Sequence, residues 1–367
     1  MNLRAVCCFL LSFTLFCCNE SGKQQDSLHI PTDSIKGGNV EVPKQEHIDI
    51  EYSDSERERF LDSIGSLPSH PLVKQTTFAT DSIFKNQLSM NKVISGSDFE
   101  KLKEVMNSSG EWNPDIDLET AKAIFGEKAI DTAQLSDGKL PLVVYSFDKH
   151  KSDWNEFAIC PGTTASGEYG WTCKLYFFRK NRIVACHTIE HHYGLEINHF
   201  KDAEGRTVIY YSENFGTGSG IWQWNYYFYK FDGDKLIPVL NELKDGNLQS
   251  GWGSRMFRLE TTIVKTNPLT MKMTYYHQLY KNGVPGPKLY QGKAIVHYKW
   301  DEASKTYLAD YDHSAITRAQ VVSYYIESGD LLFINSHSGI LKSRMTDKIL
   351  RGIIMDYLNE AMNAYYP

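Results

Sequence analysis

Long apolar segments and an excess of basic residues are both missing from this sequence. The longest apolar run, Ala5 to Cys18, has 14 residues, whereas a helix needs about 20 to cross ~30 Å of hydrocarbon. The 39 basic and 45 acidic residues give a net charge of −6, which argues against a basic face for nucleic acid or anionic lipid. We therefore expect neither a membrane-spanning body nor a nucleic-acid-binding function.

Cysteine is scarce after the first eighteen residues. Only Cys160, Cys173 and Cys186 remain there, so one disulfide with a free thiol and three buried thiols are both open. On a hairpin, Cys173 and Cys186 would lie diagonally on one face, and Cys160 with Cys173 is the competing pair. A chain of 367 residues with 41% hydrophobic residues needs no disulfide framework in order to fold.

Motifs of known catalytic chemistry are missing as well. The glycine-rich stretch from Phe215 to Gly220 lacks the Gly-Lys-Ser/Thr ending of a phosphate-binding loop and precedes a strand pattern. No G-x-S-x-G elbow occurs, and the S-x-x-K matches at Ser82 and Ser146 lack their S-D-N and K-T-G partners. We expect no bound cofactor, and the sequence favours a protein that is not an enzyme without deciding the matter.

One histidine string matches a metal-binding pattern. His187-Thr-Ile-Glu190-His191 fits the H-x-x-E-H motif, whose chemistry requires a helix that brings both imidazoles to one Zn²⁺. Here the string continues a predicted strand, on which the two histidines would lie about 13 Å apart. His192 and His199 are close in sequence. A metal-dependent hydrolase that uses His187, Glu190 and His191 is therefore the second alternative for the function.

A turn of the chain also resembles a cation site. Asp202 and Glu204 look like the remnant of an Asp-rich calcium turn. Two acidic residues supply too few oxygens, because Ca²⁺ takes about six to eight. We expect a polar turn at this place.

The first eighteen residues have the features of an export signal. Arg4 supplies one positive charge before the apolar run, which has the length of a signal-peptide core. The run ends in Leu15 to Cys18 and is followed by the polar Asn19. This ending resembles the lipobox of bacterial lipoprotein precursors, in which a Leu at −3 and a small residue at −1 precede a cysteine.

The resemblance implies a lipid anchor. Cys18 would become the first residue after a signal peptide of residues 1–17 and would carry acyl chains such as palmitate; Cys17 stands where a small residue is usual and is a second candidate. Three acyl chains hold a protein on a membrane far more firmly than one chain does. The resemblance thus predicts an anchored protein of the bacterial cell envelope, at the outer membrane, with its face toward the periplasm or the outside left open.

The next two segments differ in composition. Residues 18–50 are polar and lack periodicity, which predicts a lipid-anchored flexible tether of roughly 30 Å. Residues 51–135 carry helix signals: a capping box at Ser97 to Glu100, and Asp117 as the cap of a short helix that Gly126 ends.

From residue 136 to 313 the hydrophobic period changes to two. Three hairpins are expected: Cys173–Phe178 with Ile183–Ile189, Trp222–Phe231 with Lys235–Leu240, and Ala294–Trp300 with Thr306–Tyr311. These degenerate hairpin repeats predict an antiparallel β body, either a meander or a propeller-like arrangement. Residues 314–367 end in an amphipathic helix that starts near Thr346 and packs on the β body. The fold class is therefore α+β and mainly β.

Aromatic residues provide the candidate ligand site. Alternation along the second hairpin places Trp222, Trp224, Tyr226 and Phe228 on one face, where they either fill a core or form a platform for sugar rings or peptide side chains. Trp252 stands between glycines in a loop and is a third candidate.

These features favour a non-catalytic binding module for a glycan, peptide or protein partner, anchored to the membrane. A structural, assembly or toxin-inhibitor lipoprotein is the first alternative.

Overall fold

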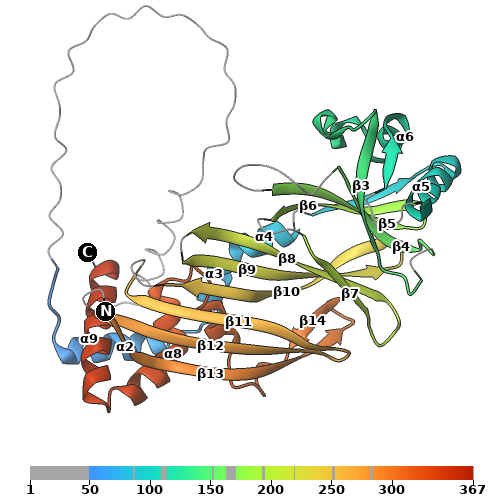
Figure 1. The fold of residues 1–367 in the computed structure, drawn as a ribbon. Coiled ribbons are helices and arrows are strands. Elements are labelled where there is room, and N and C mark those ends of the chain that lie inside the picture. Colours follow the sequence, from blue (N-terminus) through green and yellow to red (C-terminus); the bar gives the residue numbers. More distant parts are fainter. Residues whose placement is uncertain are drawn as a thin grey trace, which may run out of the picture. The chain divides into compact units, whose positions relative to one another are not determined.

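Two antiparallel sheets dominate the structure, which is a computed structural model (Figure 1). The mainly β, antiparallel architecture expected from the sequence is confirmed. The structure describes residues 49–85, 87–108, 114–150, 153–162, 171–191, 195–218, 220–249, 253–281 and 284–366. The signal peptide, Cys17, Cys18, the tether up to residue 48 and Trp252 lie outside these residues, and what the sequence predicts for them stays a prediction.

The smaller sheet has the strand order β1-β6-β5-β4-β3-β2. Its strands are β1 (Leu88–Val93), β2 (Asp115–Asp117), β3 (Lys139–Ser146), β4 (Glu156–Pro161), β5 (Trp171–Arg179) and β6 (Arg182–His191). The first predicted hairpin is β5–β6, with Lys180 at a φ of 52° in its turn. The edge strand β1 was not predicted, because its short LSMNKV sequence has no buried side chain and is held by pairing with β6.

The larger sheet is a meander in which each strand pairs with the next along the chain, from β7 to β14. Its strands are β7 (Ile197–Lys201), β8 (Thr207–Gly218), β9 (Ile221–Asp232), β10 (Lys235–Leu248), β11 (Arg255–Thr266), β12 (Leu269–Lys281), β13 (Val284–Asp301) and β14 (Thr306–Ala309). The other two predicted hairpins are β9–β10 and β13–β14. The propeller-like alternative is not confirmed, because these strands share one continuous sheet where a propeller has separate blades.

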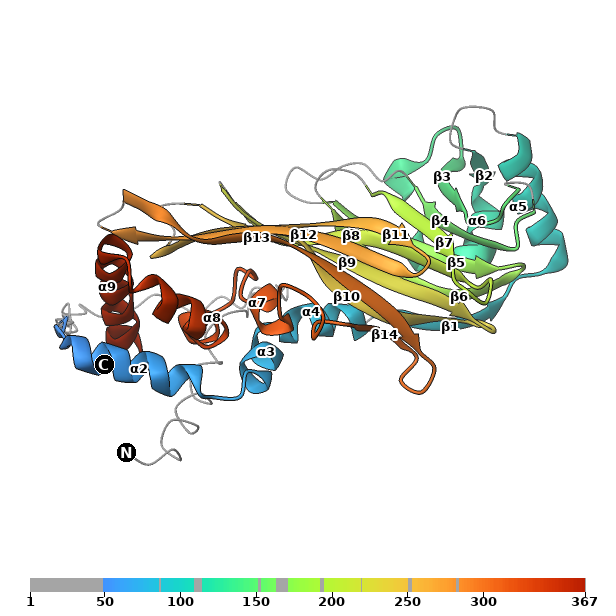
Figure 2. The same ribbon diagram turned by 90° about the horizontal axis from the view of Figure 1, so that it is seen from below.

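Helices cover one side of the larger sheet (Figure 2). The helices are α2 (Asp54–Gly65), α3 (His70–Thr76), α4 (Phe78–Lys85), α5 (Gly96–Ser108), α6 (Leu118–Phe125), α7 (Arg318–Val322), α8 (Asp330–Arg344) and α9 (Lys348–Tyr365), with short 3₁₀ turns at Glu127–Ala129 and Thr132–Gln134. Helices α8 and α9 contact β13 and α4 contacts β10, whereas α5 and α6 lie by the smaller sheet. In the part of the chain that is described, no helix is long and apolar enough to cross a membrane.

Capping residues fix where two of the predicted helices begin. Asp117 accepts a hydrogen bond from the Thr120 amide at 2.9 Å and starts α6, which Gly126 ends at a φ of 89°, as predicted. The capping residue of α5 lies two residues earlier in the chain than predicted. Ser95, not Ser97, accepts from the Asp98 amide at 3.1 Å, so the helix starts at Gly96.

The predicted C-terminal helix is α9, and it packs on β12 and β13. Asp347 caps it by accepting from the Ile349 and Leu350 amides at 2.9 and 3.1 Å. Ile349 in the first turn of the helix is 69% exposed, whereas its neighbour Leu350 is buried.

Side-chain alternation separates a buried from an open face in the larger sheet. Along β11 and β12, Leu259 and Met273 are buried against the helices, while Glu260 and Thr274 on the other face are exposed. The two sheets also contact each other through β6 and β8. The face of the larger sheet opposite the helices is called the open face below.

Candidate functional site

The tryptophans predicted to bind a ligand lie on the open face. Trp222, Trp224 and Tyr226 of β9 are half-buried there, and we call them the aromatic row. The alternate residues point toward the helices: Gln223 accepts from the Ile326 amide at 2.8 Å, and Asn225 donates to the Tyr325 hydroxyl at 3.3 Å. The predicted placement of the three rings on one face is confirmed, and this part of β9 is not buried on both sides.

The Trp222 end of the row carries its own ion pairs. Asp245 accepts a hydrogen bond from Trp222, and burial raises the pKa of this carboxyl. The Arg258 guanidinium lies 3.6 Å from Asp245 and 3.6 Å from Glu260, and 5.9 Å from the centre of the Trp222 ring. The charges at this end are therefore largely matched within the protein.

Lys244 lies at the other end of the row because of a β-bulge. Leu243 pairs with Asn225 and Asp245 with Trp224, so Lys244 is the extra residue of β10. Its ammonium donates to the Ser212 hydroxyl at 3.0 Å and lies 5.2 and 5.4 Å from the ring centres of Trp224 and Tyr226. Burial lowers the pKa of Lys244.

A shallow pocket of about 320 Å³ opens beside Lys244. Its walls include Glu196, Asn198, Tyr210, Ser212, Tyr226, Lys244 and Thr262. The ring centres of Tyr210 and Tyr226 lie 6.0 Å apart, and Tyr210 stacks on the buried Phe228 at 4.9 Å, which holds the wall in place. Aromatic faces, hydroxyls and one ammonium thus meet in one place.

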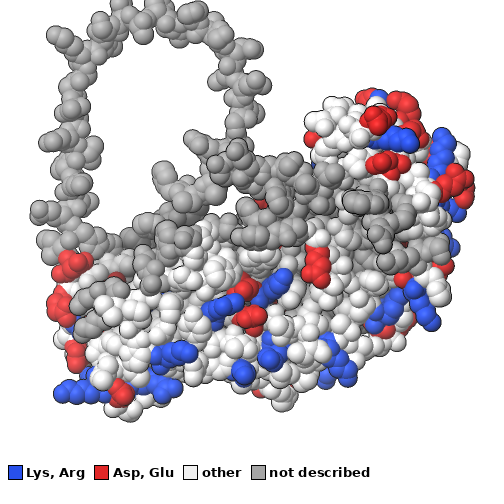
Figure 3. Space-filling view, in the orientation of Figure 1, with Lys and Arg blue, Asp and Glu red and all other residues white. Residues whose placement is uncertain are grey.

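Charges of both signs are interleaved over the strands of the open face (Figure 3). Acidic and basic side chains lie next to one another here: Arg258 of β11 is 3.6 Å from Asp245 of β10 and 3.6 Å from Glu260 of its own strand. Such a surface suits a polar ligand that makes hydrogen bonds and stacks on rings.

The histidine string does not form a metal centre in the part that is described. His187 is 1% exposed and its Nδ1 lies 3.1 Å from the Tyr211 hydroxyl, while burial lowers its pKa to about 3. Glu190 is exposed on the opposite face of β6, since it pairs with Thr172 while His187 pairs with Leu175. No group of three or more His, Cys, Asp or Glu side chains with metal-binding geometry occurs among the described residues. The side chain of His191 and all of His192 lie outside them.

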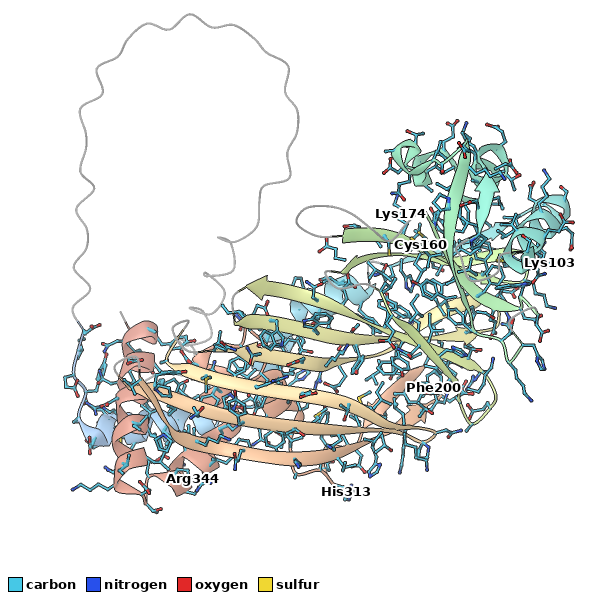
Figure 4. All side chains as sticks on the ribbon, in the orientation of Figure 1. Lys103, Cys160, Lys174, Phe200, His313 and Arg344 are labelled. Carbon is cyan, nitrogen blue, oxygen red and sulfur yellow. The ribbon has the colours of Figure 1, made fainter. Side chains whose placement is uncertain are left out.

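The expected placement of Cys173 and Cys186 on one face of the first hairpin is wrong. Cys173 lies opposite Ile189, and Cys186 lies opposite Tyr176, so the two thiols point to different faces of the sheet. The reason is a β-bulge next to Phe177, which shifts the register by one residue and reverses the faces. Cys160, which is labelled in Figure 4, packs in the same buried cluster as Cys173, and these two thiols are hydrogen-bonded. All three cysteines are buried and free.

The turn at Asp202 is a polar turn, as expected. One oxygen of Asp202 accepts from the amides of Glu204 and Arg206 at 3.0 and 2.8 Å. The other faces the Lys230 ammonium, which is buried beneath the Trp300 ring at 3.5 Å from its centre. Basic side chains of the protein therefore neutralise this carboxylate.

Sequence reasoning found Trp222 and Trp224 but missed Lys244 and Tyr210. The alternation of β9 was sufficient for the tryptophans, whereas the place of Lys244 depends on a bulge that no local pattern marks. Comparison with known proteins adds nothing to these assignments: no protein-family model, no curated protein and no solved structure matches the chain.

Proposed function

We propose that the protein is a lipid-anchored lipoprotein of the bacterial cell envelope whose open face binds a partner molecule without catalysing a reaction on it. The sequence around Cys18 supports the anchor. The aromatic row and the adjoining pocket support the binding function.

The observation that supports the binding function most strongly is that aromatic side chains of β9 are exposed in part on one face of the strand. On the opposite side of β9, Tyr227 and Tyr229 are buried in the core that the larger sheet shares with the smaller one. Trp222, Trp224 and Tyr226 instead remain half-exposed on a face that the described helices leave open. Large rings with polar tips at an accessible surface are typical of ligand contacts.

The hydrolase alternative has less support. Its histidine motif would need His187 and Glu190 close together, but His187 is in the core and Glu190 is on the other side of the strand. A structural, assembly or toxin-inhibitor role would use the same predicted anchor. Binding of one protein partner, and of no small ligand, would indicate this role.

The anchor is tested by labelling cells with an alkyne analogue of palmitate. We expect the wild type and Cys17→Ala to incorporate the label and Cys18→Ala to lose it. Unchanged labelling of Cys18→Ala would contradict the assignment.

The binding function is tested by screening the full-length protein in detergent against glycan and peptide arrays. We expect Trp224→Ala to weaken binding of any hit at least about tenfold, which corresponds to ~1.4 kcal/mol. Phe78→Ala is the control, since Phe78 is an exposed aromatic residue of α4, away from the open face. Equal binding by wild type and Trp224→Ala would count against the open face as the site.

A further inference from the structure

We propose that the pocket beside Trp224 and Tyr226 binds an acidic glycan, with Lys244 receiving the carboxylate of a uronic-acid-type sugar. This inference rests on the proposed binding function of the open face and names its ligand class.

Lys244 differs from the neighbouring cation in that no carboxylate among the described residues forms an ion pair with it, although Glu196 and Asp245 act on it electrostatically. Arg258 lies within 3.6 Å of both Asp245 and Glu260. The Lys244 ammonium instead bonds to the neutral Ser212 hydroxyl, and it forms no ion pair with the carboxylates that the structure describes. A half-buried ammonium of this kind gains a charge-assisted hydrogen bond when a ligand brings a carboxylate to it.

The surroundings of Lys244 hold its charge at the pocket. The bulge of β10 turns the side chain onto the open face, and the rings of Trp224 and Tyr226 lie near the ammonium at 5.2 and 5.4 Å. Cation–π attraction restricts where the flexible lysine stem can go. A bound carboxylate would therefore meet a charge that is already positioned.

The side chains at the pocket suit a sugar. Strand β9, which carries the aromatic row, pairs with β8 on one side and β10 on the other, so its own backbone offers no free edge to an extended peptide. The pocket walls supply the hydroxyls of Tyr210, Ser212 and Thr262 and the ring of Tyr226, and the Trp224 ring lies 5.2 Å from the Lys244 ammonium. Rings suit the apolar face of a pyranose, and hydroxyls suit its edge.

Removing the charge of Glu196 should have the opposite effect on the affinity for an acidic ligand from removing the charge of Lys244. It lines the same pocket, is exposed, and acts electrostatically on Lys244 without forming an ion pair with it. A carboxylate ligand would be repelled by Glu196 and attracted by Lys244. Removing either charge should therefore move the affinity in opposite directions.

The experiment compares two probes that differ only in charge. The full-length protein in detergent micelles is titrated with trigalacturonic acid and with its methyl ester, followed by calorimetry at low salt. We expect the acid to bind at least tenfold more tightly than the ester, Lys244→Met to abolish this preference, and Glu196→Gln to raise the affinity for the acid. Lys299→Met, which removes an exposed lysine of β13 outside the pocket, should change nothing.

Three results would overturn the inference: equal affinity for acid and ester, a preference for the acid that survives in Lys244→Met, or no binding of either probe. If the ester binds as well as the acid and Trp224→Ala abolishes both, the acidic ligand class is wrong but the open face is still a binding surface. If neither probe binds, the array screen decides the proposed function separately. Circular dichroism of Lys244→Met confirms that the variant is folded.

Discussion

His277 of β12 and His337 of α8 lie with their ring centres 5.2 Å apart in the core between the larger sheet and the helices. Among the residues that the structure describes, both nitrogens of His277 and the Nε2 of His337 have no hydrogen-bond partner. Tyr324 and Tyr290 contact the pair, and the Arg255 guanidinium is the nearest charge on β11. A proton added to either neutral imidazole would create a positive charge that is buried beside another positive charge, that of Arg255.

Acid should therefore loosen the helices from the sheet. Burial lowers the pKa of His337 to about 3 and places that of His277 well below the ordinary value of 6.5. At a pH between the folded and unfolded pKa values, the unfolded chain binds more protons than the folded protein. The free energy of unfolding therefore decreases as the pH falls below 6.5. We expect urea unfolding to show a loss approaching ~1.4 kcal/mol per pH unit for each buried histidine.

His277→Phe should flatten this pH dependence, because the ring remains while the titrating nitrogens are removed. His187 is also buried and contributes in the same direction, so the flattening will be partial. His313→Gln is the control. Its exposed imidazole pairs with Asp310, which raises the pKa of His313, and its loss should not reduce the sensitivity to acid. A steep acid dependence that persists unchanged in His277→Phe would refute the assignment.

Two glycines should respond to alanine in opposite ways. A Cβ at Gly246 of β10 would overlap the carbonyl oxygen of Tyr324, so Gly246→Ala should destabilise the protein by about 1–3 kcal/mol. Gly352 in α9 has open space around its Cβ position, so Gly352→Ala should stabilise by about 0.5–1 kcal/mol through helix propensity. Thermal unfolding measures both, and a destabilised Gly352→Ala would contradict the packing described for α9.

The buried Lys230–Asp202 pair should be costly to break from one side. Lys230 is fully buried under Trp300, so Lys230→Met leaves Asp202 with less compensation and should cost about 3–5 kcal/mol. The double variant Lys230→Met/Asp202→Asn should recover part of that loss, because the charge is removed while the amide contacts of the turn remain possible. Denaturant unfolding of the three proteins decides this, and a double variant less stable than the sum of the singles would argue against the pair.

The three thiols should be protected in the folded protein. Cys160, Cys173 and Cys186 are buried; hydrogen bonding to Cys160 and burial raise the pKa of Cys173, and burial raises that of Cys186. We expect iodoacetamide at pH 8 to label all three only after unfolding in urea, as read by mass spectrometry. Fast labelling of the native protein at Cys186 would contradict its place in the core.

Local signals predicted the elements that depend on neighbours in sequence. Asp117 and Gly126 mark the ends of α6, and a two-residue turn at Gly233 and Asp234, with Gly233 at a φ of 57°, joins the two strands of the second hairpin. Capping and turn chemistry involve residues a few positions apart, so the sequence alone contains them.

What escaped prediction depends on contacts between distant segments. The bulge at Phe177 reversed the face of Cys186, and the bulge at Lys244 put a cation into the candidate site. A bulge inserts one residue that a periodic pattern cannot distinguish from its neighbours. In the same way, alternation placed Trp222 and Trp224 on one face, but only the position of the helices shows that this face is the open one.

The first residues that the structure describes are fastened to the last helix. The amide of Ile50 donates to Asn363 at 3.0 Å, the amide of Tyr52 donates to Asn359 at 2.9 Å, and Asn359 returns a hydrogen bond to the Ile50 carbonyl at 3.0 Å. A pull applied at residue 49 would therefore be met by several hydrogen bonds along α9 before it reached any strand. A force transmitted along the chain to residue 49 would therefore act first on the hydrogen bonds between residues 50–52 and α9. The aromatic row on the other side of the sheet would be affected only after these bonds break.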